Sequence, residues 1–211
     1  MIEVLVLGGP LMVPILLASV VALAVFMARG WSLRASRVRP AALVQALEED
    51  LEAGRPDAAL ARCRGSEAPL ARVLAAGLAH PAASRAERKE RMEEVGRREV
   101  ARLERWVGVV GVIASIEPLL GLLGTVTGMI GVFQGVVADG VGDPATLASG
   151  IWSALVTTAA GLSTGIPAFV AWRSLVGLVD RRADELETHA VALLDRTAPD
   201  RPHTPTASEA A

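Results

Sequence analysis

Three long stretches that are almost free of charge limit the folds open to this chain. The first runs from Val4 to Ala28 without a charged residue. The second, Trp106 to Ala138, contains only Glu117, and the third, Pro144 to Trp172, contains none. Each is longer than the roughly 20 residues that a helix needs to cross a bilayer. We therefore expect an all-α integral membrane protein with three long transmembrane helices.

The composition agrees with a membrane setting. Hydrophobic residues make up 52% of the chain, yet aromatic residues are only 3% and tyrosine is absent. The apolar content is thus mainly alanine, valine, leucine and glycine, which allow helices to approach closely in lipid. A net charge of -2 gives no reason to expect a nucleic-acid partner. The single cysteine, Cys63, cannot form an intramolecular disulfide and is expected to be a small core residue.

The basic residues predict the orientation in the membrane, because arginine and lysine beside spanning helices stay in the cytoplasm. None precedes the first stretch, whereas several follow it, precede the second and follow the third. The loop Asp139 to Asp143 is acidic and rich in glycine. We expect a multi-pass protein of the bacterial inner membrane, whose first apolar stretch is retained as a membrane anchor and is not a cleaved signal peptide. Its N-terminus and loop should be periplasmic and its C-terminus cytoplasmic.

The chain divides into six expected segments. They are the periplasmic N-terminus and first transmembrane helix (1–30), a cytoplasmic helical domain (31–105), the second transmembrane helix (106–138), a periplasmic loop (139–145), the third transmembrane helix with its cytoplasmic extension (146–196) and a disordered tail (197–211). Within 31–105, Pro40 and Pro56 suit helix starts and Gly54 a helix end. Ser84 and Glu87 form a capping-box pattern before a charged helix that we expect to continue into the second span.

A stripe of glycines follows one face of the second span. Steps of three or four residues bring together Glu117 and the residues that we call the glycine stripe: Gly121, Gly124, Gly128, Gly131 and Gly135. This spacing favours close packing against another helix, within one chain or between copies. The alternative is that the stripe lines a pore directly.

Hydroxyl groups follow one face of the third span, at Thr146, Ser149, Ser153, Thr157 and Thr164. Such hydroxyls can bond back to their own helix. Alternatively, they face a polar interior such as a water path. Thr158 beside this row and Thr125 on the second span are further candidates for such a path.

Glu117 is the ionisable residue well inside a span. A lone carboxylate in lipid is costly, so it should be protonated, paired or wetted. Two readings stay open, a role in ion movement or a position near the inner interface. Pro118 and Pro167 each remove a helical hydrogen bond and are expected to bend their helices.

Two segments resemble a known family. GLLGTVTGMIGVF, from Gly121 to Phe133 and preceded by Pro118, and GIWSALVTTAAGLSTGIPA, from Gly150 to Ala168, resemble the paired signatures of the MotA/TolQ/ExbB proton-channel family. The three-span topology looks like that of ExbB and TolQ. The resemblance covers most of the chain except the tail.

The resemblance implies a homopentamer around the transmembrane helices of a dimeric ExbD- or TolR-like partner, whose aspartate carries protons, with a TonB- or TolA-like protein as a further partner. It places Thr125 and Thr158 at the central pore. Family members commonly have glutamate where this chain has Ser153, and a small residue where it has Glu117. The residues alone also indicate a partner helix that supplies a carboxylate, because the third span has no group that can gain or lose a proton.

We therefore expect a channel or stator subunit of an inner-membrane motor driven by proton motive force, energising transport or an envelope process. The alternative is a non-conducting membrane scaffold or transporter subunit. An enzyme is not expected, because the sequence offers no nucleophile with its base, no metal-ligand cluster and no phosphate loop. No cofactor or metal is expected either.

Overall fold

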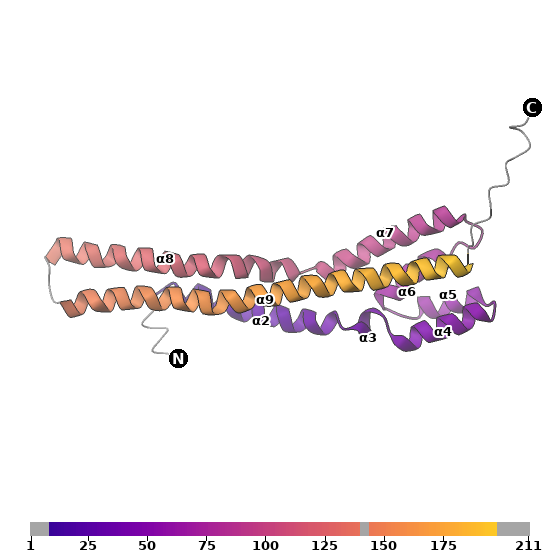
Figure 1. Cartoon of the computed structure of the whole chain (residues 1–211), viewed down its shortest axis with the longest axis horizontal. Helices are drawn as coiled ribbons and strands as arrows, with labels where there is room; N and C mark the ends of the chain where they lie inside the picture. Colours follow the sequence, from indigo (N-terminus) through magenta and orange to yellow (C-terminus); the bar gives the residue numbers. More distant parts are fainter. Residues whose placement is uncertain (1–8, 140–143, 198–211) are drawn as a thin grey trace, which may run out of the picture. The chain divides into compact units, whose positions relative to one another are not determined.

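The computed structural model describes residues 9–139 and 144–197, and this part contains helices and no strand, which confirms the all-α prediction. The helices are α2 (Met12–Ser32), α3 (Ala35–Val38), α4 (Ala41–Glu52), α5 (Pro56–Arg64), α6 (Pro69–Leu78), α7 (Arg85–Glu104), α8 (Val107–Asp139) and α9 (Pro144–Thr197) (Figure 1). The first N-terminal residues, most of the expected loop and nearly all of the expected tail lie outside the described residues.

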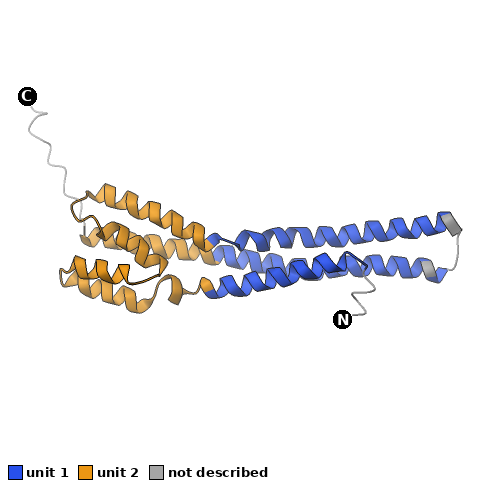
Figure 2. Cartoon of the chain, turned by 180° about the vertical axis from the view of Figure 1, so that it is seen from behind, with its two compact units in different colours: residues 1–31, 104–177 blue, residues 32–103, 178–211 orange. Residues whose placement is uncertain are grey.

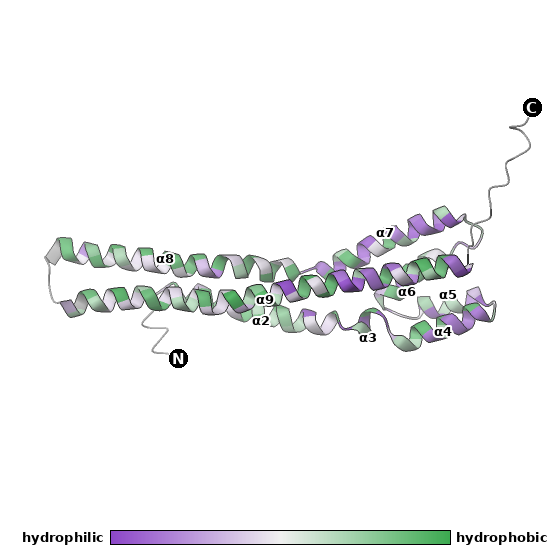
Figure 3. Cartoon of the chain, in the orientation of Figure 1, coloured by the Kyte–Doolittle hydropathy of each residue, from purple (hydrophilic) through white to green (hydrophobic). Residues whose placement is uncertain are grey.

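Three helical segments are long and apolar enough to cross a membrane: α2, the segment that includes α8, and α9. Figure 3 shows α2, α8 and the first part of α9 as mostly apolar ribbon. Large side chains point outward from them, with Val20 64%, Leu119 61% and Phe133 62% exposed. Apolar surface of this extent is stable against acyl chains or other protein, not against water. The prediction of three long membrane helices is confirmed.

The described chain forms two compact units (Figure 2). Unit 1 contains residues 1–31 and 104–177, and unit 2 contains residues 32–103 and 178–211. Helix α9 contributes residues to both.

Unit 1 consists of α2, α8 and the first part of α9. The expectation that the charged helix continues into the second span is wrong, because α7 ends at Glu104 and α8 begins at Val107. Between them Trp106 has a φ of 71°. This left-handed conformation cannot continue a right-handed helix. The Arg105 guanidinium lies 5.5 Å from the centre of the Trp106 ring, so the tryptophan ends up beside a cation at the start of the apolar helix.

Unit 2 contains α3 to α7 and the last part of α9. The helix boundaries follow the sequence signals: Pro40 precedes α4, Gly54 follows it with a φ of 67°, and Pro56 begins α5. The capping box is also confirmed. The Ser84 amide donates to Glu87 Oε2 at 2.9 Å, and the Glu87 amide donates to Ser84 Oγ at 3.2 Å.

Arg88 of α7 links the ends of two other helices in unit 2. Its side chain is buried, its Nε donates to the Gly77 carbonyl at 2.8 Å, and its Nη1 donates to the Thr197 carbonyl at 3.1 Å. Carbonyls in the last turn of a helix lack partners within that helix. Arg88 therefore satisfies the carboxyl ends of α6 and α9 with a single buried cation.

Two buried carboxylates in unit 2 are likewise paired. Asp50 accepts from Arg55 at 3.0 Å and from Arg62. Glu99 of α7 accepts from Arg72 of α6 at 2.9 Å and from Arg102 at 2.6 Å. Removing the arginines from such a site would leave a buried charge unpaired, so these clusters hold α4 to α5 and α6 to α7.

Candidate functional site

Helices α8 and α9 lie in close contact within unit 1. A Cβ added at Gly121 would lie 3.0 Å from Thr158 Cα, one at Gly124 would lie 2.4 Å from Thr157 Cγ2, and one at Gly128 would lie 2.8 Å from Ala154 Cβ. Real Cβ atoms are almost never this close to such neighbours. These three glycines are therefore required for α8 to lie against α9, as the packing interpretation predicted for them.

The other two members of the glycine stripe differ. A Cβ at Gly131 or Gly135 would meet no atom within 4 Å among the described residues. Within one chain, the structure thus gives these two glycines no close contact, and their packing role stays a prediction that concerns other copies or a partner.

Helix α9 contributes glycines of its own that the sequence analysis did not select. A Cβ at Gly161 would lie 2.5 Å from the Glu117 carbonyl oxygen, and one at Gly165 would lie 2.8 Å from Pro118 Cδ. Both lie in the run GLSTG, a GxxxG pattern that could have revealed them. The bend-prone Glu117–Pro118 step of α8 thus rests directly on this pair.

Thr158 joins the two helices through its hydroxyl. Its Oγ1 donates to the Gly121 carbonyl at 2.6 Å, across the helix contact. Thr125, one turn further along α8, is half-buried, and its Oγ1 donates to the Leu122 carbonyl of its own helix at 2.7 Å. Of the two threonines that the resemblance places at a pore, Thr158 therefore bonds across to Gly121, and Thr125 lies one turn beyond Gly121 on α8.

The hydroxyls of Thr157 and Thr164 donate to carbonyls of their own helix. Thr157 is buried with its methyl group toward Gly124, and its Oγ1 donates to the Ser153 carbonyl at 3.0 Å. Thr164 Oγ1 donates to the Ala160 carbonyl at 3.0 Å. The Ser153 side chain is half-buried, and that of Thr146 lies outside the described residues. This pattern agrees with the back-bonding interpretation for Thr157 and Thr164.

Glu117 is fully buried, with 0% of its surface exposed. Neither carboxylate oxygen has a hydrogen-bond partner in the described part of the chain. Its Cβ faces Gly165, and the Thr164 hydroxyl lies beside the carboxyl group. In one chain Glu117 therefore lies inside the contact between α8 and α9, and its position relative to the inner interface stays a prediction.

A groove of about 400 Å³ lies between α2, α8 and α9. We call this the unit 1 groove. It is mainly apolar, and its hydroxyl groups come from Ser19 of α2 and from Ser163 and Thr164 of α9. Thr164 therefore lies beside Glu117 and also lines the unit 1 groove.

Both prolines lie inside continuous helices. Helix α8 continues past Pro118, and α9 continues past Pro167. Because proline lacks an amide hydrogen, the carbonyls of Ala114 and Ser163 lose their usual helical partners. Bending at these points stays a prediction.

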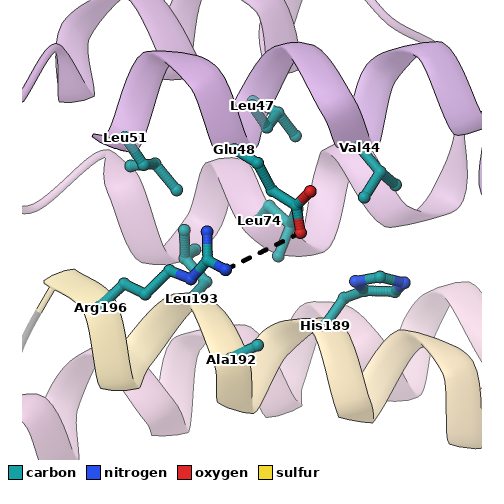
Figure 4. A pocket seen from close by; sticks show the side chains of 9 residues that line it. All are labelled: Val44, Leu47, Glu48, Leu51, Leu74, His189, Ala192, Leu193 and Arg196. Carbon is teal, nitrogen blue, oxygen red and sulfur yellow. Dashed lines mark ion pairs between the residues drawn. The ribbon is translucent and has the colours of Figure 1, made fainter. Parts of the chain in front are cut away.

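Unit 2 has a small hollow of about 40 Å³ between α4 and α9 (Figure 4). His189 and Arg196 of α9 face Glu48 of α4 there, with Arg196 Nη2 3.9 Å from Glu48 Oε1, among leucine side chains. Burial and the nearby Arg39 charge lower the pKa of His189, while Glu48 and Glu185 oppose this shift. Throughout the described residues, no group of three histidine, cysteine or acidic side chains could hold a metal ion.

The chain matches the MotA/TolQ/ExbB proton channel family over residues 65–188, which include both signature segments. It is 36% identical over 184 residues to the putative biopolymer transport protein ExbB-like 1 of Synechocystis sp., covering 84% of this chain and 71% of that protein. It is 30% identical over 152 residues to the putative biopolymer transport protein ExbB homolog of Methanothermobacter thermautotrophicus, covering 72% and 54%. It is also 35% identical over 97 residues to the Tol-Pal system protein TolQ of Pseudomonas aeruginosa, covering 43% and 42%.

Proposed function

Because the chain belongs to the MotA/TolQ/ExbB proton channel family, we propose that it is the channel subunit of an inner-membrane motor driven by proton motive force. It is a membrane protein with three long apolar helices. In this proposal several copies, five as in the resemblance, enclose the single-span helices of an ExbD- or TolR-like partner. The N-terminus is periplasmic, the C-terminus is cytoplasmic, and the motor energises transport or an envelope process, with a TonB- or TolA-like protein as a further partner.

The distribution of ionisable groups supports a partner that supplies the proton-carrying acid. From Pro144 to Trp172, α9 has no residue that can gain or lose a proton near neutral pH. Glu117 alone cannot carry a proton across a hydrocarbon core about 30 Å thick. A second carboxylate must therefore come from a helix that this chain does not contain.

The observation that carries the proposal is the Thr158 to Gly121 hydrogen bond at 2.6 Å. It joins the two signature segments directly, one turn of α8 before Thr125. The glycines behind it leave no space for side chains, so the α8–α9 pair can act as a rigid wall. Half-buried threonines on such a wall supply weak donors and acceptors without a fixed charge, which suits transfer to a moving acid.

The test is proton flux into vesicles that contain this chain with its single-span partner under an imposed pH gradient. Thr125→Ala and Thr158→Ala should lower flux while assembly, measured by size-exclusion chromatography with light scattering, is retained. Thr158→Ser keeps the hydroxyl and should restore flux, and Thr127→Ala is the matched control, because Thr127 is an exposed threonine of α8. Absence of flux from the wild-type pair would contradict the proposal.

The alternative of a non-conducting scaffold has one observation in its favour. The hydroxyls of Thr125, Thr157 and Thr164 donate to carbonyls of their own helices. If the protein is a scaffold, the wild type should conduct no protons, and Thr158→Ala should weaken assembly. The same variants therefore distinguish the two functions.

A further inference from the structure

Glu117 is a buried acid that the proposed channel does not require. Both carboxylate oxygens lack a hydrogen-bond partner among the described residues. The other charged residues within α2, α8 and the 144–172 part of α9 are Arg29, in the last turn of α2, and Asp139, the last residue of α8.

Neither of these charges lies close to Glu117. Arg29 senses the charge of Arg105, which precedes α8, whereas Glu117 lies 10 positions, or about 15 Å, along α8 from its first residue Val107. Asp139 follows Glu117 by 22 positions, or about 33 Å along α8. Within the described parts of these three helices, no counter-ion therefore stabilises a carboxylate at this site, whereas the protonated acid needs only one acceptor for its O–H group.

Thr164 is placed to be that acceptor. It lies on α9 between Gly161 and Gly165, the two residues in contact with the Glu117–Pro118 step. Its hydroxyl proton is donated to the Ala160 carbonyl, so the lone pairs of Oγ1 remain able to accept.

Thr164 also lines the unit 1 groove. A single water molecule needs only about 15 Å³ of accessible space and two or more polar partners. The groove has about 400 Å³ and the hydroxyls of Ser19 and Ser163 in addition to Thr164. It can therefore hold water next to the one hydroxyl that also reaches Glu117.

We propose that Glu117 is a proton-binding site of this chain's own, which exchanges its proton through the Thr164 hydroxyl with water in the unit 1 groove. In the forward step, the Thr164 hydroxyl turns from the Ala160 carbonyl to a water molecule in the groove. The carboxyl O–H then gives its proton to Thr164 Oγ1 while that hydroxyl gives its own proton to the water. Hydronium leaves through the groove, Thr164 is again a neutral hydroxyl, and Glu117 becomes a carboxylate. The reverse step restores the acid. This site goes beyond the proposed channel, and it holds whether or not the assembled protein conducts.

The experiment uses infrared spectroscopy of the full-length protein in lipid, without a partner and without a gradient. The difference between wild type and Glu117→Gln should contain the C=O stretch of one protonated carboxylic acid. On transfer to D₂O this band shifts, and the rate of the shift measures proton exchange at Glu117. Thr164→Val, which keeps the side-chain shape, should slow the shift about tenfold or more, as expected for loss of one relay hydrogen bond.

Two further variants make the result decisive. Thr164→Ser should exchange at the wild-type rate. Thr127→Val should also do so, because the Thr127 hydroxyl donates to the Leu123 carbonyl at 2.9 Å and does not line the groove. Absence of a carboxylic acid band, or equal exchange rates in Thr164→Val and wild type, would overturn the proposal. If lipid instead of water fills the groove, Thr164→Val and wild type should exchange at equal rates. Failure of proton flux in the channel test would leave these spectra unchanged, so the two proposals can fail separately.

Discussion

Replacing Gly161 with alanine tests a close contact between the backbones of α8 and α9. The new Cβ would lie 2.5 Å from the Glu117 carbonyl oxygen and 3.0 Å from Gly121 Cα, whereas ordinary contacts begin at 3.4 Å. Both neighbours are backbone atoms, which cannot rotate away as a side chain does. The two helices must therefore separate locally by about 0.9 Å, the difference between 3.4 and 2.5 Å.

This separation has a calculable cost. Overpacking of a close contact costs about 2 kcal/mol. Stretching the Thr158 to Gly121 bond from 2.6 Å to about 3.5 Å forfeits about 1 kcal/mol. Alanine regains about 1 kcal/mol through its higher helix propensity. We therefore expect Gly161→Ala to lower the free energy of unfolding by about 2 kcal/mol.

Gly131→Ala is the matched control, because its Cβ meets no described atom within 4 Å. It should leave the free energy of unfolding unchanged or raise it by up to about 1 kcal/mol. The assay is reversible unfolding in mixed micelles, followed by helical circular dichroism. Equal stability of the two variants would refute the reasoning that the α8–α9 contact is set by backbone proximity at Gly161.

Three predictions concern unit 2. Arg88→Met should lower the free energy of unfolding by about 2–3 kcal/mol, because two buried carbonyls lose their donor. Arg98→Met, which removes an exposed ion pair, should change the free energy of unfolding by no more than about 0.5 kcal/mol. A small effect of both substitutions would contradict the linking role of Arg88. Because burial lowers the pKa of His189, the unfolded chain binds the proton more readily than the folded chain. The free energy of unfolding should therefore fall as the pH drops below about 6.5. His189→Gln should flatten this pH dependence, as measured by chemical denaturation between about pH 5 and 7. Burial raises the pKa of Cys63 to about 11, so alkylation at pH 8 should be at least about 100-fold slower in the native than in the denatured protein. An alkylation rate of the native protein within about tenfold of the denatured rate would show that the thiol is accessible and contradict this prediction.

The sequence predicts the elements of this fold well where the signal is local. The spanning helices follow from uninterrupted apolar length, which the cost of unpaired backbone groups in lipid makes decisive. The boundaries of α4, α5 and α7 follow from Pro40, Gly54, Pro56 and the capping box at Ser84, because these residues act on their own backbone. The break at Trp106 carried no such signal, since an L-residue with positive φ is chosen by its surroundings.

The sequence by itself determined that this chain crosses a membrane with three helices, and that one face of α8 is made of glycine. Periodicity shows which residues share a face, but not what lies opposite that face. Only the tertiary structure decided that Gly121, Gly124 and Gly128 press against α9 while Gly131 and Gly135 meet nothing described. It also decided that Glu117 is enclosed against α9, because burial is a property of two surfaces in contact and not of either helix alone.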